Sequence, residues 1–374
     1  MKYNLADICE YGKGKVDVAI LDEGTYISTE NMMPNRGGIT SASSLPAMSQ
    51  TQAFFAGDVL VSNIRPYFKK IWFAEFDGGC SNDVLVFRAK AGVSKRFLYY
   101  VLSDDTFFDY SMATSKGTKM PRGDKAAIMK YGVPDFTYEE QEKIAGILEI
   151  LDRKIRLNTE INENLLQQAQ ALYKDRFIDM NPFNGTMPMD WHQGTVSEIV
   201  ELHDSKRIPL SSRERADLAK VYPYYGATSI MDYVDRYLFD GIYLLLGEDG
   251  TVADSKGFPI LQYVYGRFWV NNHAHIITGK NGFSVELLYL LFSLTSVQSI
   301  ITGAVQPKIS QANLNKVPVA IPSKKELQTL DATIQPIFAQ IRNLRDENEK
   351  LAATRDTLLP KLMSGEPDAS TLDL

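Results

Sequence analysis

The 374-residue sequence has little of several features that mark large protein classes. It contains only two cysteines, Cys9 and Cys80, too few for a disulfide framework or for holding a zinc ion by themselves. No uninterrupted apolar run approaches the ~20 residues needed to span a bilayer, and the N-terminal stretch lacks the apolar segment of a signal peptide. We therefore expect a cytoplasmic protein, and the length predicts two or three domains.

Positive charge is scarce overall but concentrated locally. The formal net charge is −6, which argues against a uniformly basic surface for binding nucleic acid. Between residues 60 and 130, however, twelve Lys and Arg stand against seven Asp and Glu, a local net charge of +5. Within this region "KGTKMPRGDK" (116–125) places four cations three residues apart, between glycines and a proline. A solvated surface loop and an anion-binding loop both fit this pattern.

The sequence contains an internal repeat. A shift of 186 residues aligns "KGTKMPRGDKAAIMKYGVPDF" (116–136) with "TGAVQPKISQANLNKVPVAIP" (302–322), matching a glycine, a proline and two cations. A shift of 190 aligns "SNDVLVF" (81–87) with "NNHAHII" (271–277) and "FLYYVLS" with "LLYLLFS". The basic loop therefore has a counterpart in the second half of the chain.

A long helical segment with a heptad seam follows each loop, and Pro336 is the one clear interruption. We expect the two helices to pack antiparallel in a register that pairs Asn158 with Asn348, because a buried amide left unpaired costs about 1–3 kcal/mol. This register places Arg355 opposite Leu151, which is a poor match. The predicted pairing residues are Ile144, Leu148, Leu151, Ile155, Asn158, Leu165, Ile337, Ile341, Asn348, Leu351, Leu358 and Leu362.

These patterns predict an α+β protein in which two similar domains with mixed sheets are joined by two long antiparallel coiled-coil helices in a pseudo-two-fold arrangement. The predicted segments are a first domain (1–136), a first helix (137–180), a second domain (181–321), a second helix (322–363) and a flexible tail (364–374).

Several stretches resemble the specificity subunit of type I restriction–modification systems, among them "GDVLVSNIRPYFKKIWFA" (57–74), "EEQEKIAGILEILDRKI" (139–155) and "YPYYGATSIMDYVDRYLFDGIYLLLGEDG" (222–250). The resemblance covers nearly the whole chain. It implies a non-catalytic DNA reader whose two target-recognition domains each read one half of an asymmetric, bipartite duplex sequence. It also implies two methyltransferase subunits and restriction subunits as partners. S-adenosylmethionine, ATP and Mg are then expected in the partners and no cofactor on this chain.

The absence of catalytic motifs agrees with this resemblance. The sequence has no G-x-x-x-x-G-K-[ST] phosphate loop, and "NPF" (181–183) lacks the second proline of the [DNS]-P-P-[YF] motif expected of an adenine methyltransferase. A self-contained enzyme that modifies or cleaves DNA and a coiled-coil scaffold without a DNA role are the alternatives.

Candidate DNA contacts are cations, amides and hydroxyls on or beside the repeated loops, since phosphates and base edges are bound by such groups. In the first domain they are Arg36, Ser62, Asn63, Arg65, Tyr67, Lys69, Lys70, Asn82, Lys116, Lys119, Arg122 and Lys125. In the second domain they are Tyr224, Tyr225, Thr228, Glu248, Asp249, Asn271, Asn272, His273, Gln306 and Lys308.

The acidic pair Glu248 and Asp249 fits more than one role. It could accept a hydrogen bond from cytosine, contact a neighbouring arginine, form a structural turn, or bind a metal ion. His273 and His275 alternate on one strand, but no third ligand stands at a fitting spacing, so we expect no metal site.

The first helix also has apolar residues beside its seam. If exposed, they would mark a groove for a partner protein. The candidate partner contacts are Leu157, Ile161, Leu166 and Tyr173.

Overall fold

The computed structural model describes residues 2–303 and 305–366, which divide into two compact units. Unit 1 comprises the chain up to Leu157 and from Glu347 onward, and unit 2 runs from Asn158 to Asp346. Each unit thus includes part of both long helices, which the sequence-based boundaries treat as separate segments. The predicted tail lies outside the described residues from 367 onward.

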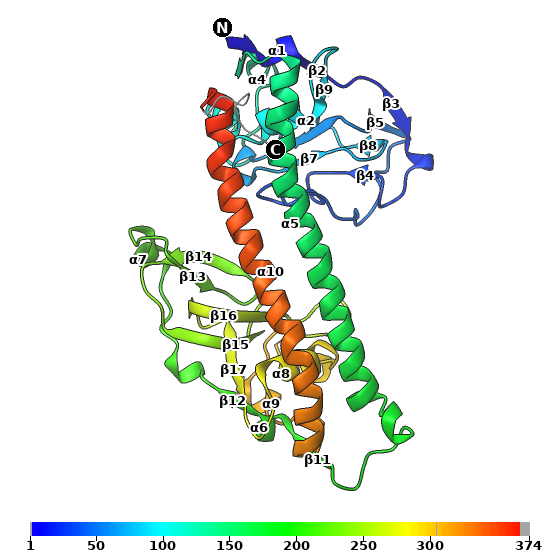
Figure 1. The fold of residues 1–374 in the computed structure, drawn as a ribbon, viewed down its shortest axis with the longest axis vertical. Coiled ribbons are helices and arrows are strands. Elements are labelled where there is room, and N and C mark those ends of the chain that lie inside the picture. The colour runs from blue at the N-terminus through cyan, green and yellow to red at the C-terminus, as the bar shows by residue number, and fades with distance from the viewer. Residues whose placement is uncertain (1, 304, 367–374) are drawn as a thin grey trace. The chain divides into compact units, whose positions relative to one another are not determined.

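In its described residues, unit 1 combines three sheets and four short helices with the parts of both long helices that it contains. Figure 1 shows these elements. The strands of unit 1 are β1 (Lys2–Asn4), β2 (Cys9–Tyr11), β3 (Lys15–Asp17), β4 (Tyr26–Ile27), β5 (Gln50–Phe54), β6 (Val59–Ser62), β7 (Ile71–Phe73), β8 (Gly78–Cys80), β9 (Val84–Ala89) and β10 (Gly132–Pro134). Its short helices are α1 (Leu5–Ile8), α2 (Lys95–Ser103), α3 (Asp105–Ala113) and α4 (Lys125–Ile128).

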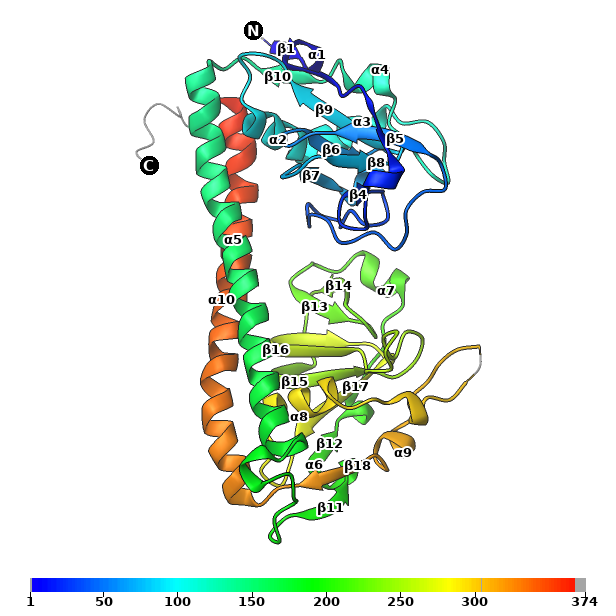
Figure 2. The ribbon, with the colours of Figure 1, turned by 90° about the vertical axis from the view of Figure 1, so that its right-hand side faces the viewer.

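The alternating side chains of β6 explain how unit 1 is layered. Val59 and Val61 face a core shared with α2, α3 and the long helices, while Leu60 faces a second core between the sheet β2-β9-β6-β7 and the sheet β3-β5-β8-β4. Figure 2 shows α2 lying between the first of these sheets and the long helix α5 (Tyr138–Tyr173). Asp104 separates α2 from α3, and its side chain caps α3.

Unit 2 is built on one six-stranded mixed sheet, ordered β12-β17-β15-β16-β13-β14, with a separate pair β11-β18. The strands are β11 (His192–Thr195), β12 (Val200–Leu202), β13 (Tyr222–Tyr225), β14 (Ile230–Val234), β15 (Phe239–Gly247), β16 (Leu261–Val270), β17 (Ala274–Gly279) and β18 (Pro318–Ile321). The short helices are α6 (Val196–Ile199), α7 (Ser212–Ala216), α8 (Val285–Ser293) and α9 (Gln311–Leu314).

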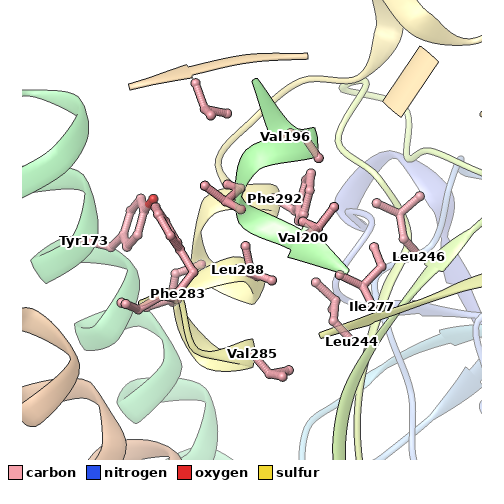
Figure 3. Packing of buried hydrophobic residues seen from close by; sticks show 14 of the residues in the cluster. Tyr173, Val196, Val200, Leu244, Leu246, Ile277, Phe283, Val285, Leu288 and Phe292 are labelled. Atoms are coloured by element: carbon pink, nitrogen blue, oxygen red, sulfur yellow. The ribbon is translucent and has the colours of Figure 1, made fainter. Parts of the chain in front are cut away.

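The main core of unit 2 lies where α8 covers the sheet. Figure 3 shows Leu244 and Ile277 of the sheet, Leu288 and Phe292 of α8, and Tyr173 at the end of α5 in one buried cluster. The N-terminal part of the second long helix, α10 (Lys324–Ser364), adds Ile334 and Phe338 to this cluster.

The two long helices run antiparallel within unit 1. Ile144 and Leu148, near the start of α5, pack with Leu359 and Leu362, near the end of α10. Further along, the Asn348 amide donates to the carbonyl of Ile155 at 3.2 Å. The pairing of Asn158 with Asn348 stays a prediction.

Arg355, the poor match in the predicted register, has a polar partner instead. Its guanidinium donates to the carboxylate of Asp152 at 2.7 Å, and Tyr100 of α2 donates to the other oxygen at 2.8 Å. This layer is therefore polar and fastens both helices to the globular part of unit 1.

Pro336 does not interrupt α10, contrary to the prediction. Ile334 and Phe338, on either side of it, are both buried in the core of unit 2, and this packing holds the helix across the proline. At the other end, α5 ends at Tyr173 and continues as a π-helical turn, Lys174–Ile178, within the predicted range.

Candidate nucleic-acid interface

The basic loop of unit 1 is a short β-hairpin. The amides and carbonyls of Lys116 and Arg122 exchange two hydrogen bonds, at 2.9 and 3.0 Å. Gly117 directly after Lys116 has φ +92°, a left-handed conformation that glycine adopts without a Cβ penalty. The sequence "KGTKMPR" therefore closes on itself and exposes its tip.

The hairpin is fastened to the segment that follows β6. The Arg65 amide donates to the Pro121 carbonyl at 2.8 Å, and the Gly123 amide donates to the Asn63 carbonyl at 3.2 Å. The two basic segments singled out from the sequence are thus brought together by backbone hydrogen bonds. Ser62 and Asn63 are buried at this junction, which removes their side chains from the surface that DNA could touch.

The cations of this hairpin are held by exposed ion pairs. Lys116 contacts Asp124 at 2.6 Å, and this hydrogen bond lowers the pKa of the Asp124 carboxyl. Arg122 contacts Asp83 at 3.1 Å. Lys119, Lys125 and Asn82 are exposed around them. Surface pairs of this kind stabilise a fold by only ~0–1 kcal/mol, so DNA phosphates can replace the carboxylates at little cost.

The remaining predicted cations of unit 1 are engaged within the fold. Arg36 and Lys69 both pair with Asp105 of α3. The Lys70 ammonium donates to the Thr29 carbonyl at 2.6 Å, and burial lowers the pKa of this lysine. Arg36 and Lys70 therefore hold loops together, whereas Arg65 is partly exposed and Tyr67 is exposed beside the hairpin.

Unit 2 repeats the hairpin with a different sequence. Thr302 and Lys308 exchange two backbone hydrogen bonds, at 2.9 and 2.7 Å, and Gly303 has φ +88°. The Gly250 amide donates to the Pro307 carbonyl at 3.0 Å, and the Ile309 amide donates to the Glu248 carbonyl at 2.8 Å. Each of these bonds has its equivalent in unit 1 at a shift of 185 or 186 residues, so the repeat seen in the sequence is a repeat in structure.

A buried cluster of charges lies beneath the second hairpin. The Arg207 guanidinium donates to the Glu248 carboxylate at 2.6 Å, and the Lys308 ammonium contacts the other oxygen at 3.2 Å. Burial raises the pKa of Glu248, but the hydrogen bond from Arg207 and the neighbouring positive charges lower it overall.

This geometry decides among the roles left open for the acidic pair. Glu248 is engaged by Arg207 and is 87% buried as a side chain, its exposed fraction being 13%, so it does not face a base edge. Asp249 is hydrogen-bonded to His273. The prediction of DNA contact by Glu248 is therefore replaced by the arginine contact, which shapes the root of the hairpin.

The same cluster was tested as a metal site. In the described part of the chain, Asp204, Glu248 and His275 are the group whose ligand atoms lie close enough together, within 4.8 Å, to hold an ion. Arg207 and Lys308 already contact the Glu248 carboxylate, and a divalent cation would have to displace them against their own charge. The residues present do not fit a metal.

The other predicted residues of unit 2 divide by exposure. Tyr224 and Asn271 are buried, and the Asn271 amide donates to the Tyr225 carbonyl at 3.0 Å, so these residues shape the sheet edge. Thr228, Asn272, Gln306 and Lys308 are exposed. The four exposed residues come from three loops that follow β13, β16 and α8.

The candidate partner contacts on α5 also divide. Leu157 and Ile161 are 45% and 44% exposed. Leu166 is half-buried, and Tyr173 is buried in the core of unit 2, so Tyr173 is not available to a partner protein.

Sequence reasoning missed Asp204 and Arg207. Asp204 begins a 3-10 turn, Asp204–Lys206, and Arg207 is the C-cap of this turn. Arg207 bonds to Glu248, 41 residues further along the chain, and Asp204 bonds to Gln311, 107 residues further along. Three charged residues in "DSKR" after a strand were the only local signal.

Every helix in the described part of the chain is too short or too polar to cross a bilayer.

Comparisons with known proteins agree with this geometry. The family model described as "Type I restriction modification DNA specificity domain" matches residues 1–167 and 188–353. The HindI specificity subunit of Haemophilus influenzae is 22% identical, over 98% of this chain and 99% of its own. The MjaIX specificity subunit of Methanocaldococcus jannaschii is 25% identical, over 74% of this chain and 70% of its own.

Another H. influenzae relative named as a specificity subunit is 32% identical, but the match spans only 34% of this chain and 32% of that protein. The crystal structure of an S subunit from M. genitalium is similar in fold, with a TM-score of 0.55 and 17% identity over 97% of this chain and 96% of that one. With both copies of the hairpin-bearing unit matched by the family model, the chain belongs to the DNA specificity subunits of type I restriction–modification systems.

Proposed function

We propose that this subunit reads an asymmetric, bipartite duplex sequence, with one hairpin-bearing unit on each half-site. The observation that carries the proposal is the repeated hairpin, built on equivalent backbone hydrogen bonds in both units and ending in exposed polar and positively charged residues. The side chains at the two tips differ, "KGTKMPR" in one and "TGAVQPK" in the other, so the two half-sites should differ as well.

The residues proposed to contact DNA are those that remain on the surface. In unit 1 they are Arg65, Tyr67, Asn82, Lys116, Lys119, Arg122 and Lys125. In unit 2 they are Thr228, Asn272, Gln306 and Lys308. Lysines supply contacts to phosphates, while the amides of Asn82, Asn272 and Gln306 suit base edges.

Methylation and cleavage are proposed to belong to partner subunits. The sequence lacks a phosphate loop and an adenine methyltransferase motif, and the charge cluster of unit 2 does not fit a metal. Two methyltransferase subunits and restriction subunits, carrying S-adenosylmethionine, ATP and Mg, would supply the chemistry. The exposed Leu157 and Ile161 of α5 are the proposed docking residues for a methyltransferase subunit.

Methylated-base sequencing of DNA from cells that carry this subunit with its partners tests the reading directly. The expected result is a split motif whose two halves are unrelated in sequence. Lys119→Gln and Lys308→Gln should each lower methylation of the motif, whereas Asn82→Ala should relax the motif in one half only and Gln306→Ala in the other. An unchanged, continuous motif would contradict the proposal.

The repeat supplies matched controls. Lys130 and Lys316 occupy equivalent positions outside the hairpins, and both are exposed. Lys130→Gln and Lys316→Gln remove the same charge and should leave the motif intact. Binding of the purified subunit to duplex DNA should also fall steeply with salt, which a scaffold without a DNA role would not show.

A further inference from the structure

His275 is a fully buried histidine whose two ring nitrogens both face acceptors. It lies on β17 with none of its side chain exposed. Its Nδ1 is 2.6 Å from the carboxylate of Asp204, and its Nε2 is 2.8 Å from the carbonyl of Ile309. A carbonyl oxygen only accepts hydrogen bonds, so Nε2 carries a proton.

Asp204 is the other partner of the ring. Its carboxylate also accepts from the Ile276 amide at 2.8 Å and from the Gln311 side chain. Burial raises the pKa of Asp204, but the hydrogen bond with His275 and these bonds lower it overall. The two nitrogens of the ring therefore bridge Asp204 and the Ile309 carbonyl.

The charges around the ring come from every neighbouring segment. Asp204 and Glu248 supply two negative charges, with Glu248 at 3.8 Å from Nδ1. Arg207 contacts both carboxylates, at 3.6 and 2.6 Å, and Lys308 contacts Glu248. The buried ring therefore lies beside two carboxylates, and its hydrogen bonds with Asp204 and Ile309 offset the cost of burying it.

The ring also touches the root of the second hairpin. Ile309 directly follows Lys308, and its amide donates to Glu248. His275 thus binds the Ile309 carbonyl, and Glu248 binds the Ile309 amide. Unit 1 has no equivalent, because the position 190 residues earlier is Leu85, a buried apolar residue.

We propose that His275 is a positioning residue for DNA recognition: its ring ties the buried carboxylate of Asp204 to the Ile309 carbonyl and so fixes the second hairpin before DNA arrives. Asp204 and Arg207 take part in the same positioning, because Asp204 binds the ring and Arg207 contacts both carboxylates. This inference rests on the proposed function, in which the second hairpin contacts DNA.

Two variants and one direct measurement test it in the full-length subunit. Asp204→Asn and His275→Gln should speed hydrogen exchange at the amides of Lys308 and Ile309 on the order of tenfold, and weaken discrimination at one half-site by a similar factor. Exchange at the Lys116 and Arg122 amides of the first hairpin should not change. If both variants leave exchange at Lys308 and Ile309 unchanged, the inference is wrong.

Nitrogen NMR of histidine-labelled wild-type protein tests the positioning role of His275 even if a variant does not fold. The chain has four histidines, and the spectrum should show one ring whose Nε2 carries a proton that exchanges slowly with water. His275→Gln, or failing that the spectra of the other three single variants, identifies the signal. A His275 ring without a proton on Nε2 would overturn the proposal.

Lys308→Gln separates this inference from the function on which it rests. That variant removes an exposed charge and leaves the Ile309 carbonyl in place, so it should weaken DNA binding without faster exchange at Ile309. If Lys308→Gln and Gln306→Ala leave DNA binding unchanged while Asp204→Asn speeds exchange, the hairpin is positioned as inferred but does not contact DNA. If Lys308→Gln weakens binding while both cluster variants change neither exchange nor discrimination, only the positioning role fails.

Discussion

In unit 1 the hairpin rests on largely exposed ion pairs, Lys116 with Asp124 and Arg122 with Asp83, whereas in unit 2 the equivalent hairpin rests on the buried pair of Glu248 with Arg207. The backbone hydrogen bonds are the same in both. The backbone is therefore the repeated part, and the side chains that hold it have diverged. An exposed pair exchanges its carboxylate for a phosphate at little cost, while a buried pair fixes the loop.

The largest difference is expected in the salt dependence of DNA binding. Replacing Lys116, Lys119 and Lys125 together by Gln should lower affinity on the order of 100-fold near 0.1 M salt and reduce the slope of log K against log salt by about 2 to 3. Lys308→Gln should reduce the slope by about 1 at most. Fluorescence anisotropy with a duplex bearing the target measures both. Equal slopes for the two variants would contradict the division of roles between the hairpins.

The second prediction concerns the carboxylates beneath the hairpins. Glu248→Gln leaves Arg207 buried with only its longer contact to Asp204, at 3.6 Å, and should lower the free energy of unfolding of unit 2 by about 3 kcal/mol. Asp83→Asn, at the exposed pair of unit 1, should lower stability by ~0–1 kcal/mol. Denaturant unfolding followed by hydrogen exchange in each unit separates the effects. A large loss from Asp83→Asn would show that the first hairpin is also fixed by its ion pair.

A third prediction uses the glycines at the two hairpin turns. Both have positive φ, so alanine costs about 1–2 kcal/mol in either. At Gly303 the added Cβ would also lie 2.3 Å from the Gln306 carbonyl oxygen, whereas at Gly117 it would lie 3.3 Å from that of Met120. Gly303→Ala should therefore impair its half-site more than Gly117→Ala, in the same methylation assay. The reverse order would mean that the second hairpin relaxes readily at its tip.

How much of this could be predicted from the sequence depends on the range of the interactions. The heptad pattern predicted two long helices, which are α5 and α10 in the structure, because the seam depends on periodicity alone. The shift of 186 residues found the counterpart of the basic loop, because glycine and proline set its turn locally. The twelve predicted pairing residues are all buried or half-buried.

Side-chain partners from distant segments could not be predicted in this way. Arg36 and Lys69 look like surface cations in the sequence, and only the fold brings Asp105 to both of them. The same applies to Glu248, whose partner Arg207 lies on a loop 41 residues earlier. Residue type suggested the chemistry of these groups, but tertiary packing decided which of them are left for DNA.

The smallest expected difference lies in the response to acid. The pKa of Asp204 is lowered in the folded chain, so the stability that this carboxylate confers is present above the ordinary Asp pKa of about 4 and is lost as pH falls. Asp124 in unit 1 also has a lowered pKa, but it is exposed and should contribute little. Unfolding of unit 2, measured between about pH 6 and pH 3, should therefore depend less on pH in Asp204→Asn than in the wild type, while Asp124→Asn leaves the profile of unit 1 nearly unchanged. An Asp204→Asn profile parallel to the wild type would mean that the buried charge of this carboxylate does not hold the second hairpin, and the two hairpins would then differ only at their tips.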